Sequence, residues 1–332
     1  MTERKIAVFG CKTTTVFLIK ALREFAQIDA VVTISQETAA RANVADYCDV
    51  TLVCSENGIP CYTAEQYSLN NTRDRAEIAR MNLDIGFVIG WQRLIPAEVL
   101  NSFSIGVFGM HGSSDDLPLG RGRSPMNWAL IERRSHFHTN LFRYDAGVDS
   151  GDILDSFVFS IQPSDTAETM HFKNVLAMKH LIRKNIEKLN KGNFELRPQK
   201  DVKPTFYPKR SPEDSIIDWR QDIFQIDAHI RAVTRPFNGA FTFCSKEKVS
   251  IYRADIFETD LVDYGYMRKT IGEVVEVFPN GKFIVRCRGG LLLIHDYEAA
   301  CDIGVSTLLH SPVDLIKQFQ RNTSGYYDIE QP

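Results

Sequence analysis

A glycine-rich, polar stretch behind a short apolar strand constrains the fold of this chain more than any other feature. Residues 104–108 form an apolar run that predicts a buried strand, and residues 109–154 follow, in which His111, Arg121, Arg123, Asp145 and Asp149 stand among many glycines. We expect His111 to lie just past the carboxyl end of this strand, at the edge where open α/β sheets bind ligands. A surface loop with one satisfied histidine is the alternative, but the combination of residue types favours a functional site.

Short apolar strands alternate with helical patterns in the first part of the chain. Residues 6–10 and 30–34 predict strands on either side of a helix. A long amphipathic helix is expected at residues 165–189. Further strands are expected at residues 51–54, 60–62, 83–89 and 138–144. This alternation predicts an α/β, Rossmann-like domain that spans residues 1–200.

The pattern changes after a polar segment that contains Pro198, Pro204 and Pro208. Short alternating strands follow, separated by tight turns at Asn280-Gly281 and Gly289-Gly290. These strands are expected at residues 240–243, 249–254, 271–278, 282–288 and 291–295. They predict a small OB-like β-barrel domain at residues 201–332, which ends in a helix at residues 312–319.

Charge and cysteine content exclude several classes of function. The 332 residues have a formal net charge of −3, which gives nucleic-acid binding no general electrostatic support. The seven cysteines are odd in number and never spaced as CxxC, so we expect reduced thiols, no metal site and a cytoplasmic protein. No apolar run is long enough for a membrane span, and we expect no membrane partner.

The turn after the first strand is the first candidate for substrate binding. Gly10, Lys12 and Thr13 precede a helix whose N-terminus is suited to a phosphate group. The turn lacks the full Gly-x-Gly-x-x-Gly pattern, so a nicotinamide cofactor is not favoured.

The motifs, taken in order, resemble those of the folate-dependent formyltransferases, in the two-domain branch that contains methionyl-tRNA formyltransferase and the sugar-nucleotide formyltransferases. The resemblance rests on residues 109–151 and on Arg121-Gly122-Arg123-Ser124-Pro125-Met126-Asn127-Trp128. In the C-terminal part it rests on residues 217–220, 230–233 and 235–241.

The resemblance implies a catalytic group made of His111, Asp149 and the residue at position 109, where this chain has Gly109 and the family an asparagine. It also implies a site for the formyl donor, N10-formyltetrahydrofolate. That site comprises Ile89, Trp91, Arg93, Leu94, Ile95, Asp145 and Val148. The residues expected to bind the acceptor are Gly10, Lys12, Thr13, Ser113, Arg121 and Arg123.

Formyl transfer to an amine makes definite chemical demands on these residues. Attack on the formyl carbon creates an oxyanion, which the His111 imidazole is suited to stabilise, and a proton must leave the amine with the help of Asp149. Gly109 offers no side-chain amide for the oxyanion. We expect a backbone N–H, a bound water or the displaced side chain of Asn127 to compensate.

The sequence therefore favours an N-formyltransferase whose acceptor is a nucleotide-linked amino sugar. One alternative is methionyl-tRNA formyltransferase, for which Lys200, Lys203, Lys209 and Arg210 are a small basic set. The other is a catalytically inactive folate or nucleotide-sugar binding protein, suggested by Gly109. A homodimer remains an open alternative for the assembly.

Overall fold

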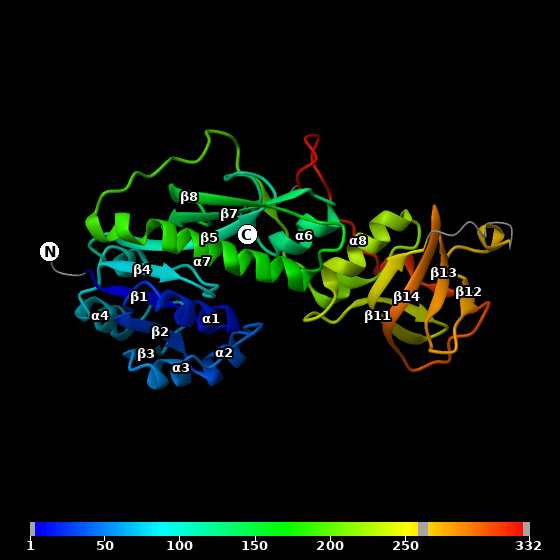
Figure 1. Ribbon diagram of the computed structural model, residues 1–332, viewed down its shortest axis with the longest axis horizontal. Helices are drawn as coiled ribbons and strands as arrows, with labels where there is room; N and C mark the ends of the chain where they lie inside the picture. The colour runs from blue at the N-terminus through cyan, green and yellow to red at the C-terminus, as the bar shows by residue number, and fades with distance from the viewer. Residues whose placement is uncertain (1–3, 258–264, 328–332) are drawn as a thin grey trace.

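The first part of the chain forms a seven-stranded mixed sheet in the computed structural model, which describes residues 4–257 and 265–327. The strand order is β3-β2-β1-β4-β5-β7-β8 (Figure 1). The strands are β1 (Ile6–Phe9), β2 (Ala30–Ile34), β3 (Cys61–Ala64), β4 (Ile85–Val88), β5 (Gly106–Ser113), β7 (His136–Arg143) and β8 (Ile153–Ser160). The strands from β3 to β5 in this order pair in parallel, whereas β7 and β8 pair antiparallel. The predicted α/β domain is confirmed.

Helices cover this sheet, and the long α7 (Ala167–Lys191) lies against β7 and β8 and contacts α1 (Thr13–Leu22). Thr166 caps the start of α7 by accepting a hydrogen bond from the N–H of Thr169, and Gly192 ends it in the left-handed conformation. The remaining helices of this part are α2 (Gln36–Arg41), α3 (Thr51–Glu56), α4 (Thr72–Arg80), α5 (Ala97–Leu100) and α6 (Pro125–Ile131).

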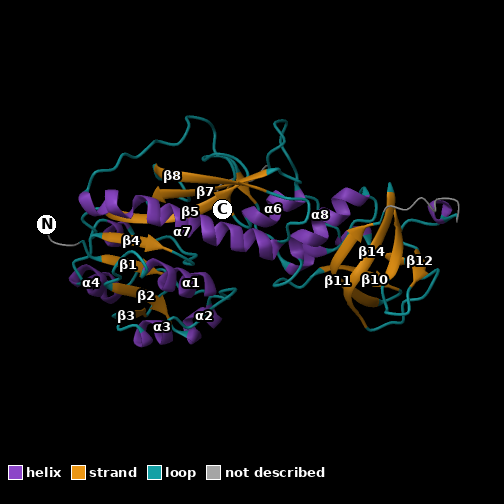
Figure 2. Ribbon diagram, in the orientation of Figure 1, coloured by secondary structure: helices purple, strands orange, loops and turns teal. Residues whose placement is uncertain are grey.

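The second sheet is antiparallel and curls on itself (Figure 2). Its order is β12-β13-β14-β11-β10-β15. The strands are β10 (Ala240–Cys244), β11 (Glu247–Ile256), β12 (Val274–Val277), β13 (Phe283–Cys287), β14 (Gly290–Ala299) and β15 (Leu309–His310). A bridge between Glu273 and Leu308 brings the two ends of the sheet together. Each of the five strands expected here is present, which supports the prediction of a barrel-like C-terminal domain.

One apolar cluster joins the two sheets, and the first sheet is packed by two further clusters of its own. The helix α8 (Ile223–Val233) packs against α6, and the buried side chains of Leu130, Phe137, Ile226 and Ile230 belong to the same cluster as the inner face of the second sheet. The two short strands β6 (Arg121–Gly122) and β9 (Phe206–Tyr207) also pair in parallel. The segment after residue 200 is thus anchored to the first domain.

Two predicted elements are wrong. Residues 51–54 were expected as a strand but begin α3, because the Asp49 carboxylate accepts the N–H of Thr51 and the helix leaves Leu52 66% exposed while it buries Val53. The terminal helix expected at residues 312–319 is only a 3-10 turn at Val313–Leu315. The chain then extends, and Phe319 places its ring edge-on against Trp128 at 4.8 Å.

Candidate active site

His111 and Asp149 are in direct contact. His111 is only 8% exposed, and its Nδ1 lies 3.3 Å from Oδ2 of Asp149. Its Nε2 lies 2.9 Å from the carbonyl oxygen of Gly120. Both of these oxygens accept hydrogen bonds, so a hydrogen on either ring nitrogen has an acceptor beside it. The predicted catalytic pair is therefore brought together in the fold.

The position of His111 corrects one expectation. It lies inside β5 and not in a loop beyond a strand, because β5 continues to Ser113 along its antiparallel partner β7. The parallel pairing with β4 ends at Val88 and Gly109, so His111 still lies past the carboxyl end of the neighbouring parallel strand.

Asp149 is held in the left-handed region at φ +49° by contacts to its backbone and side chain. The side-chain amide of Gln199 donates to the carbonyl oxygens of Asp149 at 2.7 Å and Gly151 at 2.9 Å. The N–H of Gly122 donates to the Asp149 carboxylate at 3.3 Å. Asp145 closes the same loop by accepting from the Ser150 hydroxyl at 2.6 Å. The carboxylate orientation is thus set by three separate chain segments.

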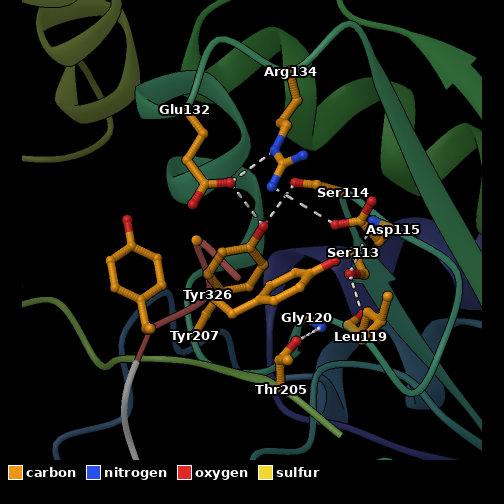
Figure 3. Close-up of polar contacts among 12 residues, drawn as sticks. Ser113, Ser114, Asp115, Leu119, Gly120, Glu132, Arg134, Thr205, Tyr207 and Tyr326 are labelled. Carbon is orange, nitrogen blue, oxygen red and sulfur yellow. Dashed lines mark hydrogen bonds and ion pairs between the residues drawn. The ribbon is translucent and has the colours of Figure 1, made fainter. Parts of the chain in front are cut away.

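The segment that carries the Gly120 carbonyl is fixed by a network of hydrogen bonds (Figure 3). The hydroxyl of Ser113 donates to the carbonyl of Leu119 at 2.8 Å, and the N–H of Gly120 donates to the Thr205 hydroxyl at 2.8 Å. The Tyr207 hydroxyl contacts Ser114 at 3.0 Å (Figure 3). Ser113, expected at the acceptor site, uses its hydroxyl to hold this segment.

The space beside Gly109 is not open. An ideal Cβ at this glycine would lie 1.7 Å from Cε2 of Tyr144, so the tyrosine ring occupies the place of any side chain at position 109. Asn127 is also unable to compensate there, since its side-chain amide donates to the carbonyl of Ala232 at 2.6 Å. Neither a water in this space nor Asn127 therefore compensates for the missing amide, and compensation by a backbone N–H stays a prediction.

Of the two candidate arginines, only Arg121 faces the catalytic pair. Its guanidinium donates to the Gln199 side chain at 2.6 Å, and its Nε is buried without a partner among the described residues. Burial lowers the pKa of Arg121, and the nearby carboxylates of Asp149 and Asp145 partly offset this effect. Arg123 is exposed.

The segment from Gly90 to Pro96, expected at the donor site, is anchored by its apolar residues. Ile89, Trp91 and Ile95 are buried, whereas Leu94 is 52% exposed. Trp91 packs edge-on against Tyr67 at 4.8 Å, and its indole N–H is buried without a partner among the described residues. Arg93 lies over the ring of Tyr67 at 5.2 Å and does not join the catalytic pair.

The turn between β1 and α1 lies beside this segment. A Cβ at Gly10 would come within 2.0 Å of the Ile89 carbonyl, so the close approach of these two chain segments requires glycine. Lys12 immediately precedes α1, and burial lowers its pKa while Asp46 partly offsets the change. The Thr13 hydroxyl donates to Asp46 at 2.7 Å.

Sequence reasoning missed two residues of this site. Tyr144 covers Gly109 from 35 positions away, and Gln199 links Arg121 to the backbone of Asp149. No motif marked either residue, although Tyr144 directly precedes the predicted Asp145 loop. Val148 lies half-buried within that loop.

His111 and Asp149 line neither of two cavities in the structure. A cavity of about 410 Å³ is lined by Tyr144, Asp145 and residues of α5. A larger one of about 570 Å³ lies between α6, α8 and residues 316–327 and is lined by neither His111 nor Asp149. The described residues include no cluster of three or more His, Cys, Asp or Glu side chains suited to a metal ion. No helix in the described ranges combines the length and apolarity needed to cross a membrane.

Comparison with known proteins agrees with this architecture. Residues 4–182 match the family described as formyl transferase, and residues 209–303 match the formyl transferase C-terminal domain. An N-formyltransferase from Helicobacter canadensis, solved with folinic acid and dTDP-3-aminofucose, is 17% identical with a TM-score of 0.63, covering 89% of this chain and 100% of that one.

Two further solved structures share the fold. HypX from Aquifex aeolicus, solved with tetrahydrofolic acid, is 17% identical with a TM-score of 0.61 over 89% of this chain and 44% of its own. Methionyl-tRNA formyltransferase from Clostridium thermocellum is 20% identical with a TM-score of 0.53 over 76% of this chain and 94% of its own. Because the family models match both parts of the chain, this protein belongs to the formyl transferase family of enzymes.

Proposed function

We propose that the protein is an N-formyltransferase that moves the formyl group of N10-formyltetrahydrofolate to the amine of a nucleotide-linked amino sugar. The contact between His111 Nδ1 and Asp149 Oδ2 carries this proposal, since it supplies an acid–base pair within a formyl transferase fold. Solved proteins of similar fold are described with folinic acid and a dTDP-amino sugar, which supports a reduced folate as donor and a nucleotide sugar as acceptor.

The pair has a defined part in the reaction. The amine forms a bond to the formyl carbon, the formyl oxygen gains a negative charge, and the attacking nitrogen loses a proton. Asp149 is the partly exposed member of the pair and accepts that proton, while His111 holds its carboxylate. The bond from the formyl carbon to N10 of the folate then breaks, and N10 takes the proton that Asp149 had accepted.

We expect the donor folate to bind near Tyr144, between the segment of residues 90–96 and the loop of residues 145–149. The exposed Leu94 offers an apolar contact for a flat ring, and the free indole N–H of Trp91 lies in the same segment. Asp145 and Val148 lie on the segment that also carries Asp149. Ile89, Arg93 and Ile95 lie in or beside the segment of residues 90–96, and we expect them to hold it in place at the donor site.

The acceptor is expected to place its phosphates near the N-terminus of α1. Gly10, Lys12 and Thr13 form the turn before this ten-residue helix, whose free N–H groups attract anions. Arg121 reaches toward Asp149 and is suited to a phosphate or a sugar carboxylate. Arg123 lies exposed directly after β6, where it is available to an extended acceptor.

A transfer assay on a panel of acceptors tests the proposal. The purified protein is incubated with N10-formyltetrahydrofolate and nucleotide-linked amino sugars, and tetrahydrofolate formation is followed together with the mass of the sugar. We expect one amino sugar to gain a formyl group, and its N-acetylated form to give none because its nitrogen is blocked.

The controls separate this function from its alternatives. His111→Gln is expected to abolish transfer, whereas His310→Gln, in the second sheet, is expected to retain it. Formylation of methionyl-tRNA in place of every sugar contradicts the proposed acceptor. Binding of donor and sugar without transfer indicates the inactive binding protein instead.

A further inference from the structure

The structure leaves the developing oxyanion without an available donor on His111. Both ring nitrogens of His111 are engaged, one with Asp149 and the other with the Gly120 carbonyl. Gly109 has no side chain, and the Tyr144 ring takes the space beside it. Acyl transfer needs a donor aimed at the position of the oxyanion, because charge develops there in the transition state. The reaction therefore requires a free donor close to the pair.

The free donors in this region differ in their accessibility. Trp91 Nε1, Arg121 Nε and Asn140 Nδ2 are enclosed and have no partner among the described residues. The Tyr144 hydroxyl also has no hydrogen-bond partner within the described part of the chain, but it is not among the enclosed atoms. Tyr144 also lines the cavity of about 410 Å³ beside Asp145. Of these four residues, Tyr144 is the one that lines this cavity.

The Tyr144 ring is held firmly for such a role. The ring stacks on Phe142 with centroids 5.3 Å apart and planes at 14°, and it covers Gly109. The backbone N–H of Tyr144 donates to the Val107 carbonyl at 2.8 Å, which fixes the residue directly after β7 and beside the start of β5. A donor held in one position loses little freedom when the transition state forms.

We propose that Tyr144 is a catalytic residue whose hydroxyl donates a hydrogen bond to the oxyanion of the tetrahedral intermediate. This inference rests on the proposed function. When the amine bonds to the formyl carbon, the electron pair of the C=O bond moves to oxygen, and the Tyr144 O–H donates to that oxygen. The pair returns to the carbon when the bond to N10 breaks, and the tyrosine keeps its proton throughout.

The surroundings of the phenol keep it in the donating form. Burial is the main cause that raises the pKa of Tyr144, and the negative charge of Asp149 raises it further. The hydroxyl therefore remains protonated at neutral pH. The glycine at position 109 leaves room for this ring, since any side chain there would displace it.

Tyr144→Phe tests the role directly, because it retains the ring and removes only the hydroxyl. We expect kcat to fall by about 10²–10³-fold, the effect of losing one oxyanion donor, with the KM of the formyl donor nearly unchanged. Tyr297→Phe is the matched control, since that hydroxyl donates to the Gly281 carbonyl in the second sheet. It is expected to retain the wild-type kcat.

A second pair of variants tests the geometry. Tyr144→Ala removes the ring that blocks position 109, so that Gly109→Asn in this background supplies an amide donor in the vacated space. We expect the double variant to recover kcat by about tenfold over Tyr144→Ala alone, as expected when part of a donor's effect returns.

The possible failures are distinguishable. A wild-type protein that transfers no formyl group to any acceptor overturns both the proposed function and this role. A wild-type protein that transfers, with a Tyr144→Phe variant of equal kcat, overturns the role of Tyr144 alone.

Discussion

Adding one methyl group at Gly109 is expected to destabilise the protein by a predictable amount. In Gly109→Ala the new Cβ lies 1.7 Å from Cε2, 2.6 Å from Cδ2 and 2.7 Å from Cζ of Tyr144. Carbon atoms in ordinary contact are about 3.5–4.0 Å apart, so the ring must move by about 2 Å. Gly109 is paired with Val88 on one side and Phe142 on the other, so its backbone has no room to retreat.

The cost follows from the neighbours of the ring. Overpacking of this kind costs about 1–3 kcal/mol, and loss of the stacking between Tyr144 and Phe142 adds about 0.5–1.5 kcal/mol. We therefore expect Gly109→Ala to lower the free energy of unfolding by about 2–4 kcal/mol, with no contribution from strain because φ of Gly109 is not positive.

Urea unfolding of a double-mutant cycle measures this effect. In the Tyr144→Ala background, Gly109→Ala is expected to cost less than about 0.5 kcal/mol, since the obstacle is gone. Gly304→Ala serves as a control because a Cβ there meets only Thr307 Oγ1, at 4.0 Å. An equal cost of Gly109→Ala in both backgrounds, or a cost near zero in the wild type, would refute the reasoning.

Three further predictions concern the site and the fold. His111→Ala and Asp149→Asn are each expected to lower kcat by about 10²–10⁴-fold in the transfer assay. The double variant is expected to be little slower than the slower single variant. Full activity of either single variant removes that residue from the mechanism. Arg121→Ala is expected to lower kcat/KM for the nucleotide sugar by about 10–100-fold, because one charged hydrogen bond is lost, and to leave the KM of the folate unchanged. A change in the KM of the folate instead would place Arg121 at the donor site. Burial alone would raise the pKa of Asp74, but hydrogen bonds from two backbone N–H groups and the Tyr62 hydroxyl lower it below its ordinary value. The Asp74 carboxylate therefore stabilises the fold fully above its unfolded pKa of about 4, and this stabilisation is lost as the pH falls through the lower folded pKa. We expect the difference in unfolding free energy between the wild type and Asp74→Asn to shrink in acid. A difference independent of pH contradicts this.

The order of strands and helices followed from local patterns because the apolar runs of the sheet are bounded by turn residues. The same reasoning failed at α3, where a short apolar run fits a helix and a strand equally well. The contact between Asp49 and Thr51 and the burial of Val53 and Cys54 decide for the helix. It also failed at His111, because the length of β5 depends on its pairing with β7. Periodicity carries no information on such a partner.

The site was only partly accessible from the sequence. His111 and Asp149 were predicted to act together and lie in contact, as their motifs indicated. The ring of Tyr144 over Gly109 and the link from Gln199 to Arg121 depend on tertiary packing between distant segments. Those contacts had to be read from the structure, and they changed the interpretation of Gly109 from a vacancy to a space that Tyr144 fills.

Carbon-13 NMR with a donor labelled at the formyl carbon tests the central claim most directly. After incubation with the protein and the amino-sugar panel, we predict that the label moves from the folate to a formamide bonded to the sugar nitrogen. The same mixture with Asp149→Asn is predicted to keep the label on the folate. Label released only as formate, or retained on the folate with the wild-type protein and every acceptor, would contradict the account.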